Sequence, residues 1–121
     1  MGLDMYAYIT KTPIDAVDFK TPDDGQEIAY WRKHPNLHGW MRERYYEKGG
    51  QAASFNCAPV RLDADDIDAL EAAVNSDALP LTMGFFFGES DPECAHDDHA
   101  FIAAAREALA AGCCVFYDSW W

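Results

Sequence analysis

Motifs that mark common enzymes and exported proteins are missing from this chain of 121 residues. It has no phosphate-binding loop and no dinucleotide-binding glycine pattern, and no motif singles out Ser90, Ser119 or Cys57 as a nucleophile. No segment approaches the roughly 18 consecutive apolar residues of a membrane helix. The first residues lack the basic stretch that opens a signal peptide. These absences favour a cytoplasmic protein without membrane association, and they weigh against an enzyme.

Cysteine is present, but without the spacing that gives it a metal or redox role. Cys57, Cys94, Cys113 and Cys114 form no C-x-x-C pair. Neighbouring residues of a strand point to opposite faces, so Cys113 and Cys114 are poorly placed to bond each other. We therefore expect reduced thiols, which also fits a cytoplasmic location.

Basic residues are scarce in the second half of the chain. The net charge is −12, and residues 1–61 hold eight acidic and eight basic residues. Residues 62–121 hold thirteen acidic residues and a single base, Arg106. A field of this sign repels nucleic acid and attracts basic surfaces. Direct nucleic-acid binding is therefore not expected, and a basic protein is the kind of partner that the charge favours.

The apolar residues are numerous enough to build a core, and their spacing predicts the elements. Half of the residues are apolar and 14% are aromatic, which suits one folded domain over residues 1–121. Strands are expected over residues 3–10, 27–33, 55–62, 81–88 and 113–118, and helices over 35–48, 63–75 and 92–111. This order predicts an α+β domain, with a mixed or antiparallel sheet of four to five strands and about three packed helices.

Several local features give these predictions detail. The segment 11–26 is expected to be a loop with a turn at Pro22–Gly25. Pro59 favours an edge position or a bulge for the weak strand at 55–62, and Asp63 is a good N-cap for the next helix. Leu81–Gly88 is apolar throughout, which predicts a central strand. The two tryptophans at the end of the sequence are expected to be docked on the fold.

The stretch Tyr30–Trp40, YWRKHPNLHGW, gathers aromatic rings, cations and histidines. Arginine binds carboxylates and phosphates in a planar, bidentate manner, and helix starts favour anions. One interpretation is an anion or nucleotide site, whose predicted residues are Asp4, Tyr30, Arg32, His38 and Trp120. The alternative is that the rings belong to the core and that Arg32 pairs with an internal acid such as Asp4.

Acidic residues crowd the start of the helix expected at 63–75. A row of carboxylates can imitate the phosphates of nucleic acid and occupy a basic groove on a partner. The predicted partner-binding residues are Asp63, Asp65, Asp66, Asp68 and Glu71. The alternative is that these acids cap the helix, complement its dipole and keep the protein soluble.

The segment from Cys94 to His99 is dense in metal-ligand types, with His96 and Asp98 between its ends. Its spacing does not supply four convergent ligands on one helix. The sequence therefore predicts no metal and no cofactor, and the segment is interpreted as a solvated helix start; the alternative is a metal site that uses His96 and His99, which are three apart on a helix.

Four blocks resemble a family of small proteins from phages and bacterial genomes. They are MGLDMYAY (1–8), YWRKHPNLHGW (30–40), LPLTMGFFFG (79–88) and FYDSWW (116–121). Some members of that family carry a phosphoglycerate-kinase label, which this chain is too short to support. The chain departs from the family pattern after Gly88, where members usually continue Ser-Thr-x-Tyr-Asp. The resemblance implies a phage or mobile-element protein and no particular chemistry.

Two functions follow as hypotheses. The first is a non-enzymatic acidic interaction protein, such as an inhibitor of a host nucleic-acid-binding defence complex of the CRISPR type. The second is a domain that binds a small molecule, or an enzyme of unrecognised type, through Arg32 and His38.

Overall fold

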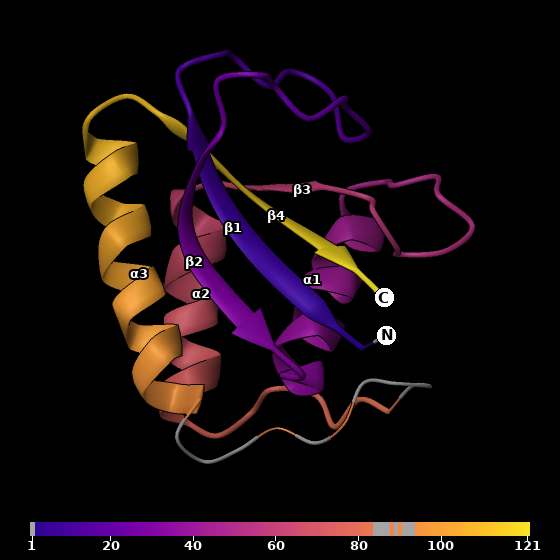
Figure 1. Cartoon of the computed structure of the whole chain (residues 1–121). Coiled ribbons are helices and arrows are strands. Elements are labelled where there is room, and N and C mark those ends of the chain that lie inside the picture. Colours follow the sequence, from indigo (N-terminus) through magenta and orange to yellow (C-terminus); the bar gives the residue numbers. More distant parts are fainter. Residues whose placement is uncertain (1, 84–87, 89, 91–93) are drawn as a thin grey trace.

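The computed structural model describes residues 2–83, 88, 90 and 94–121 and consists of one sheet and three helices (Figure 1). Along the chain the elements are β1 (Asp4–Thr10), β2 (Gln26–Arg32), α1 (Pro35–Glu47), β3 (Val60–Leu62), α2 (Ala64–Asn75), α3 (Cys94–Ala110) and β4 (Cys114–Trp120). The α+β class predicted from the sequence is confirmed, with four strands in the sheet.

The strands lie in the order β2-β1-β4-β3, and every neighbouring pair is antiparallel. The central strands are therefore β1 and β4, which pair along their whole length from Asp4 opposite Trp120 to Thr10 opposite Cys114. A register shift between Ala7 and Tyr8 interrupts the pairing of β1 with β2. The strand predicted at 55–62 shortens to β3, which lies at the edge because a proline at position 59 removes a ladder donor.

All three helices cover the same face of the sheet, behind the strands in Figure 1. Side chains alternate across a strand, so Met5 and Ala7 of β1 and Val115 and Tyr117 of β4 point to this face. They pack against residues of the helices such as Leu37, Trp40, Met41, Ile67, Leu70, Phe101 and Ile102. One continuous core therefore lies between the sheet and the helix layer.

The loop between β1 and β2 crosses part of the opposite face. The ring of Phe19 meets the ring of Phe116 edge-on at 5.6 Å between centroids. The turn predicted at Pro22–Gly25 forms, with the Gly25 N–H donating to the Pro22 carbonyl at 3.2 Å. Phe116 is fully buried as a result, although it points away from the helices. This loop shields one end of that face only.

The prediction of a central strand at Leu81–Gly88 is wrong for its described beginning. Leu81 and Met83 are outside any strand and are 85% and 84% exposed, while residues 84–87 lie outside the described part of the chain. Between them, the Thr82 N–H donates to Asn36 Oδ1 at 3.1 Å, which holds this segment against α1. An apolar run does not reveal its partner, and β1 and β4 occupy the centre of the sheet.

The helix boundaries follow local signals. The side chain of Asp63 accepts from the Asp66 N–H at the start of α2, as its sequence predicts. Gly112 follows α3 with φ +86°, a left-handed conformation that glycine adopts without strain. In the described ranges, no helix has the length and apolar character that crossing a membrane requires.

Candidate functional site

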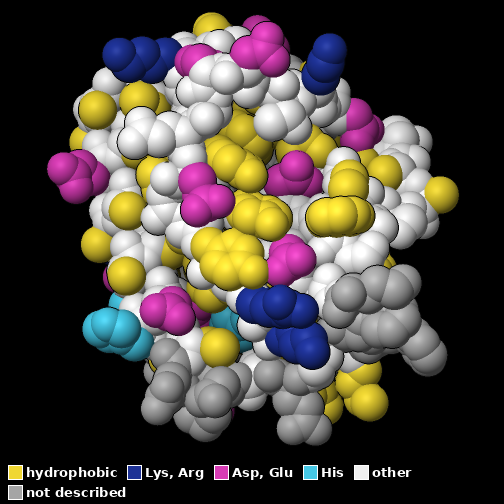
Figure 2. Space-filling view, in the orientation of Figure 1, with side chains coloured by type: hydrophobic (Ala, Val, Ile, Leu, Met, Phe, Trp, Pro, Cys, Tyr) yellow, Lys and Arg dark blue, Asp and Glu magenta, His cyan; other side chains and the backbone are white. Residues whose placement is uncertain are grey.

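The sheet face that the described helices leave uncovered carries a line of stacked aromatic rings. Tyr30 on β2, Tyr6 and Tyr8 on β1 and Phe116 on β4 follow one another with centroid distances of 5.2, 6.0 and 5.2 Å. Figure 2 shows hydrophobic side chains interspersed with acidic ones over these strands. We call this surface, made by the outward side chains of β1, β2 and β4, the open face.

Carboxylates lie between the rings of the open face. The Tyr30 hydroxyl donates to Asp4 Oδ1 at 2.7 Å, and this hydrogen bond, with some desolvation, raises the pKa of Tyr30. Burial raises the pKa of Asp118, which points outward from β4. Burial and the charge of Asp4 raise the pKa of Tyr6. The phenols therefore stay neutral at physiological pH, and the surface combines apolar rings with acidic groups.

A cavity of about 310 Å³ lies at one end of the open face, lined by Gly2, Asp4, Trp120 and Trp121. Trp120 is 64% exposed. Trp121 is held by Asn56, whose Oδ1 accepts from its backbone N–H at 3.2 Å and whose Nδ2 donates to its carbonyl at 3.1 Å. The ring of Trp121 packs against His38 at 4.8 Å between centroids. The exposed indole of Trp120 and the carboxylate of Asp4 are therefore the side chains that the cavity offers to a partner.

Four of the five residues predicted to bind a ligand lie together on the open face. Asp4 is the register partner of Arg32 on one side and of Trp120 on the other. Tyr30 contacts Asp4 directly. Arg32 is exposed, as is Trp120. These four residues therefore form one surface, as alternation along β1, β2 and β4 requires.

His38, the fifth predicted residue, lies in the core on the opposite side of the sheet. Its side chain is 1% exposed, and its Nδ1 lies 2.7 Å from the Tyr117 hydroxyl. Burial, assisted by the charge of Arg42, lowers the pKa of His38 to about 3. The imidazole is therefore neutral at physiological pH, and it does not share a site with Arg32.

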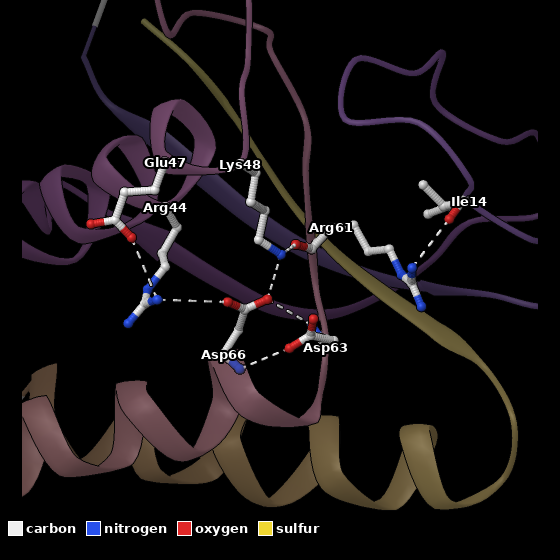
Figure 3. Close-up of polar contacts among 7 residues, drawn as sticks. All are labelled: Ile14, Arg44, Glu47, Lys48, Arg61, Asp63 and Asp66. Atoms are coloured by element: carbon white, nitrogen blue, oxygen red, sulfur yellow. Dashed lines mark hydrogen bonds and ion pairs between the residues drawn. The ribbon is translucent and has the colours of Figure 1, made fainter.

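Two of the acids predicted to bind a partner are engaged at the start of α2. Asp66 is 5% exposed and receives ion pairs from Lys48 and from Arg44, the latter at 4.0 Å (Figure 3). It also accepts from the Asp63 backbone N–H at 2.9 Å, while Asp63 caps the helix in return. These contacts tie α2 to the end of α1. They agree with the alternative interpretation of the sequence, in which the acids cap the helix, and they add ion pairs to it.

Two more of these acids pair with the single base of the second half of the chain. Arg106 of α3 donates to Glu71 at 2.7 and 3.1 Å and to Asp68 at 2.9 Å. The hydrogen bond from Arg106 lowers the pKa of Glu71. Asp65 is exposed between these groups. The acids of α2 therefore fasten neighbouring helices together, and their role toward a partner stays a prediction; the open face is a second candidate for contact with a partner.

Replacing Asp66 by alanine is expected to lower the free energy of unfolding by about 2–3 kcal/mol, because Lys48 and the Asp63 N–H each lose an acceptor that is shielded from solvent. Urea denaturation measures this change. Asp65→Ala is the matched control, since Asp65 is an exposed acid one position earlier, and it is expected to change stability by less than about 0.5 kcal/mol. Equal losses in both variants would contradict the assignment.

The segment Cys94–His99 does not gather metal ligands. In the described part of the chain, no group of three His, Cys, Asp or Glu side chains is placed to hold a metal ion. Asp98 is instead buried, where it meets His34 and Trp31. His96 and His99 are exposed on α3.

Sequence reasoning missed Tyr6, Tyr8 and Asp118 as members of the open face. The sequence did contain a signal for them. β1 carries bulky residues on both of its faces, and the face that the helices do not cover needs another covering or a partner. The missing information was which face the helices would take.

Comparisons with protein-family models, curated proteins and solved structures found nothing that matches this chain. The functional assignment therefore depends on the geometry of the open face and on the distribution of charge.

Proposed function

We propose that this chain is an interaction protein whose open face binds a basic segment of another protein. The observation that carries the proposal is the cavity lined by Asp4, Trp120 and Trp121. A lysine or arginine side chain that enters it would meet the carboxylate of Asp4 and the exposed indole of Trp120. Indole faces attract cations, and the attraction grows as water is excluded. Asp4 in the same wall makes this cavity unsuitable for an anion.

Three further properties support a protein partner. Tyrosine and tryptophan are enriched where protein surfaces bind tightly, because they bury a large area at a low cost in side-chain entropy. The line of rings from Tyr30 to Phe116 is held by the sheet backbone and is therefore preorganised. The net charge of −12 accelerates encounter with a basic partner.

The resemblance to phage-encoded proteins suggests a setting for this activity. A host defence complex that binds nucleic acid presents a basic groove, and an acidic, aromatic surface suits such a groove. We therefore propose inhibition of such a complex as the biological role. The acids of α2 contribute to the long-range field in this proposal, while the open face makes the contact.

The proposal is tested with a labelled oligo-arginine peptide, whose binding is followed by fluorescence anisotropy at low and high salt. Trp120→Ala is expected to weaken binding by about tenfold or more, as removal of a central aromatic anchor does. Binding should also weaken as salt rises. Tyr46→Ala is the matched control, because Tyr46 is an aromatic residue on α1 that is also exposed, at 41% against 64% for Trp120.

A pair of charge reversals separates the two acidic surfaces. Asp4→Lys on the open face is expected to abolish peptide binding, whereas Asp65→Lys on α2 removes the same charge elsewhere and should weaken it only slightly. Equal weakening by both variants would show that the total charge matters and the open face does not. Undiminished binding by Trp120→Ala would remove the cavity from the proposal.

A further inference from the structure

A second cavity, of about 260 Å³, shares no lining residue with the open face. It lies where the start of α1, the end of α2 and the start of α3 meet. Its lining residues are His34, Asn36, Val74, Asp77, Leu79, Ser90, Cys94, Ala95 and Asp98. Apolar side chains therefore form one part of its wall, and a cluster of polar groups forms another.

The polar groups form a chain from a serine to a buried carboxylate. Ser90 Oγ lies 2.7 Å from Nδ1 of His34, and Nε2 of the same ring lies 3.0 Å from Asp98 Oδ2. His34 and Asp98 are 3% and 1% exposed. A serine, a histidine and an aspartate in this sequence of contacts are the components of nucleophilic acyl transfer.

The partners of Asp98 determine which nitrogen of His34 carries the proton. Asp98 Oδ1 accepts from the Trp31 indole N–H at 3.1 Å. An ionised carboxylate only accepts hydrogen bonds, so the neutral imidazole donates to it from Nε2. Nδ1 is then the acceptor that faces the Ser90 hydroxyl. The ring nitrogens exchange the roles that they have in chymotrypsin-like triads, but the relay is continuous because both distances are those of hydrogen bonds.

Ser90 is also placed where negative charge on its oxygen is stabilised. The backbone N–H of Asn36, in the first turn of α1, donates to Ser90 Oγ at 3.1 Å. The start of a helix carries a partial positive charge. As the hydroxyl proton moves to His34, the oxygen keeps this donor and gains from the helix field. A serine that only capped α1 would need the contact with the Asn36 N–H alone. The buried His34–Asp98 pair next to Ser90 is not required for capping.

A donor for the oxyanion of an acyl intermediate is present in the same wall. The side chain of Asn36 lines the cavity, and its Oδ1 is occupied by the Thr82 N–H at 3.1 Å. Among the described residues no hydrogen bond occupies its Nδ2, so this amide is the candidate donor. Asparagine in this role stabilises the charge that develops on a carbonyl oxygen.

We propose that Ser90, His34 and Asp98 form an acyl-transfer site that hydrolyses small esters. Ser90 Oγ attacks the ester carbonyl, an O–C bond forms, and the hydroxyl proton passes to Nδ1 of His34. When the tetrahedral intermediate collapses, the bond to the alcohol breaks and the alcohol leaves with that proton. Water then attacks the acyl-serine and gives its proton to His34. The acyl C–O bond to Ser90 breaks, His34 returns that proton to Oγ, and the carboxylic acid leaves.

The cavity indicates the class of substrate. Val74, Leu79 and Ala95 offer apolar wall for an acyl chain, and a volume of about 260 Å³ limits this chain to a few carbon atoms. Asp77 in the wall disfavours an anionic substrate. A short-chain ester of an uncharged or cationic alcohol fits both properties. The inference is independent of the binding function proposed for the open face.

The whole chain is incubated with a fluorophosphonate probe, and the modified peptide is identified by mass spectrometry. In this reaction an O–P bond to Ser90 forms and fluoride leaves. Wild type is expected to carry the probe on Ser90 and to hydrolyse p-nitrophenyl acetate. Ser90→Ala should lose both properties, whereas Ser76→Ala, which changes an exposed serine at the end of α2, should keep them.

Asp98→Asn distinguishes a catalytic Ser90–His34–Asp98 relay from a serine that only caps α1. The amide keeps an acceptor for Trp31 but no longer accepts from Nε2–H of His34 in the same orientation, so kcat is expected to fall by about 10²–10⁴-fold in a variant that stays folded. Folding is checked by circular dichroism. Absence of probe from folded wild type, labelling at another residue, or an unchanged kcat in Asp98→Asn would each overturn the proposal. The site of probe labelling is determined on the wild-type protein alone, so the proposal can be tested even if a variant folds poorly.

Discussion

Asp98→Ala is expected to lower the free energy of unfolding by about 2–6 kcal/mol, because two buried ring N–H donors lose their acceptor at about 1–3 kcal/mol each. Asp98 is 1% exposed, and it accepts hydrogen bonds from Trp31 at 3.1 Å and from His34 at 3.0 Å. Alanine leaves both ring N–H groups without an acceptor, in a place that water does not reach freely.

The contacts of Asp98 also explain why this loss should be global. Trp31 belongs to the core on β2 and packs edge-on against Phe101 of α3 at 5.2 Å between centroids. His34 connects β2 to α1. The carboxylate therefore joins the sheet, α1 and α3 at one point, and its removal is expected to weaken the whole cooperative unit rather than a single helix.

Urea denaturation at neutral pH measures the effect, with Asp97→Ala as the matched control. Asp97 precedes Asp98 on the same helix and is exposed in its first turn, where an acid contributes a few tenths of a kcal/mol through the helix dipole. A loss below about 1 kcal/mol for Asp98→Ala, or equal losses for the two variants, would show that this carboxylate is not the junction described here.

Stability is also expected to fall by about 2–3 kcal/mol between pH 6.5 and 4.5, because of His38. In the unfolded chain this imidazole takes up a proton as the pH falls through about 6.5, its ordinary value. In the folded chain burial and the charge of Arg42 lower its pKa to about 3. The unfolded state thus binds more protons throughout this window, and the folded state loses about 1.4 kcal/mol per pH unit.

The sign of this effect is fixed by the direction of the shift. A histidine whose pKa is depressed on folding contributes its full stability above pH 6.5 and loses it progressively as the pH falls towards 3. The acids whose pKa values are lowered, Asp24 and Glu71 among them, act mainly at lower pH, below the ordinary values of 3.8 and 4.5 for these side chains. Asp118, whose pKa burial raises, acts in the opposite direction above pH 3.8, so the upper part of the interval reports the histidine most directly.

A series of urea unfolding curves across this interval tests the prediction. His38→Asn replaces the imidazole by an amide that can still meet the Tyr117 hydroxyl, which lies 2.7 Å from Nδ1 in the native chain. The variant is expected to be less stable at pH 7 but to show a much flatter dependence on pH. A wild-type curve that is flat from pH 6.5 to 4.5, or a variant with an unchanged slope, would place the titrating group elsewhere.

The two proposed activities use different parts of one architecture. The open face is created because three helices cover one side of a four-stranded sheet and leave the outward side chains of β1, β2 and β4 for a partner. The cavity beside Ser90 is created where the ends of the helices meet. A substitution in one site therefore touches no residue of the other, so the two activities can be tested separately.

Local signals in the sequence predicted most elements and their ends. Alternation over residues 3–10 gave β1, Pro35 marked the start of α1, and Asp63 capped α2. These signals work because they depend on residues within one turn or one strand. The apolar run that begins at Leu81 gave a wrong prediction because it is also a local signal. Hydrophobicity does not say which surface covers a segment.

The composition of the candidate sites depended on long-range contacts. The sequence grouped His38 with Arg32 because they are close along the chain, whereas strand alternation and the position of α1 place them on opposite sides of the sheet. It predicted the acids of α2 to meet a partner, which stays a prediction, and did not foresee that Lys48 and Arg106 also meet them within the fold. Pairing within the chain is favoured because those bases are held nearby at no further cost in entropy.

The sequence by itself determined the fold class, the positions of most helices and strands, and a charge that repels nucleic acid. These follow from composition and from patterns only a few residues long. Only the tertiary structure decided which sheet face stays open, and only it brought Ser90 within reach of His34 and His34 within reach of Asp98. These contacts span more than fifty positions, and no local pattern encodes them, because they depend on how the sheet and its helices pack.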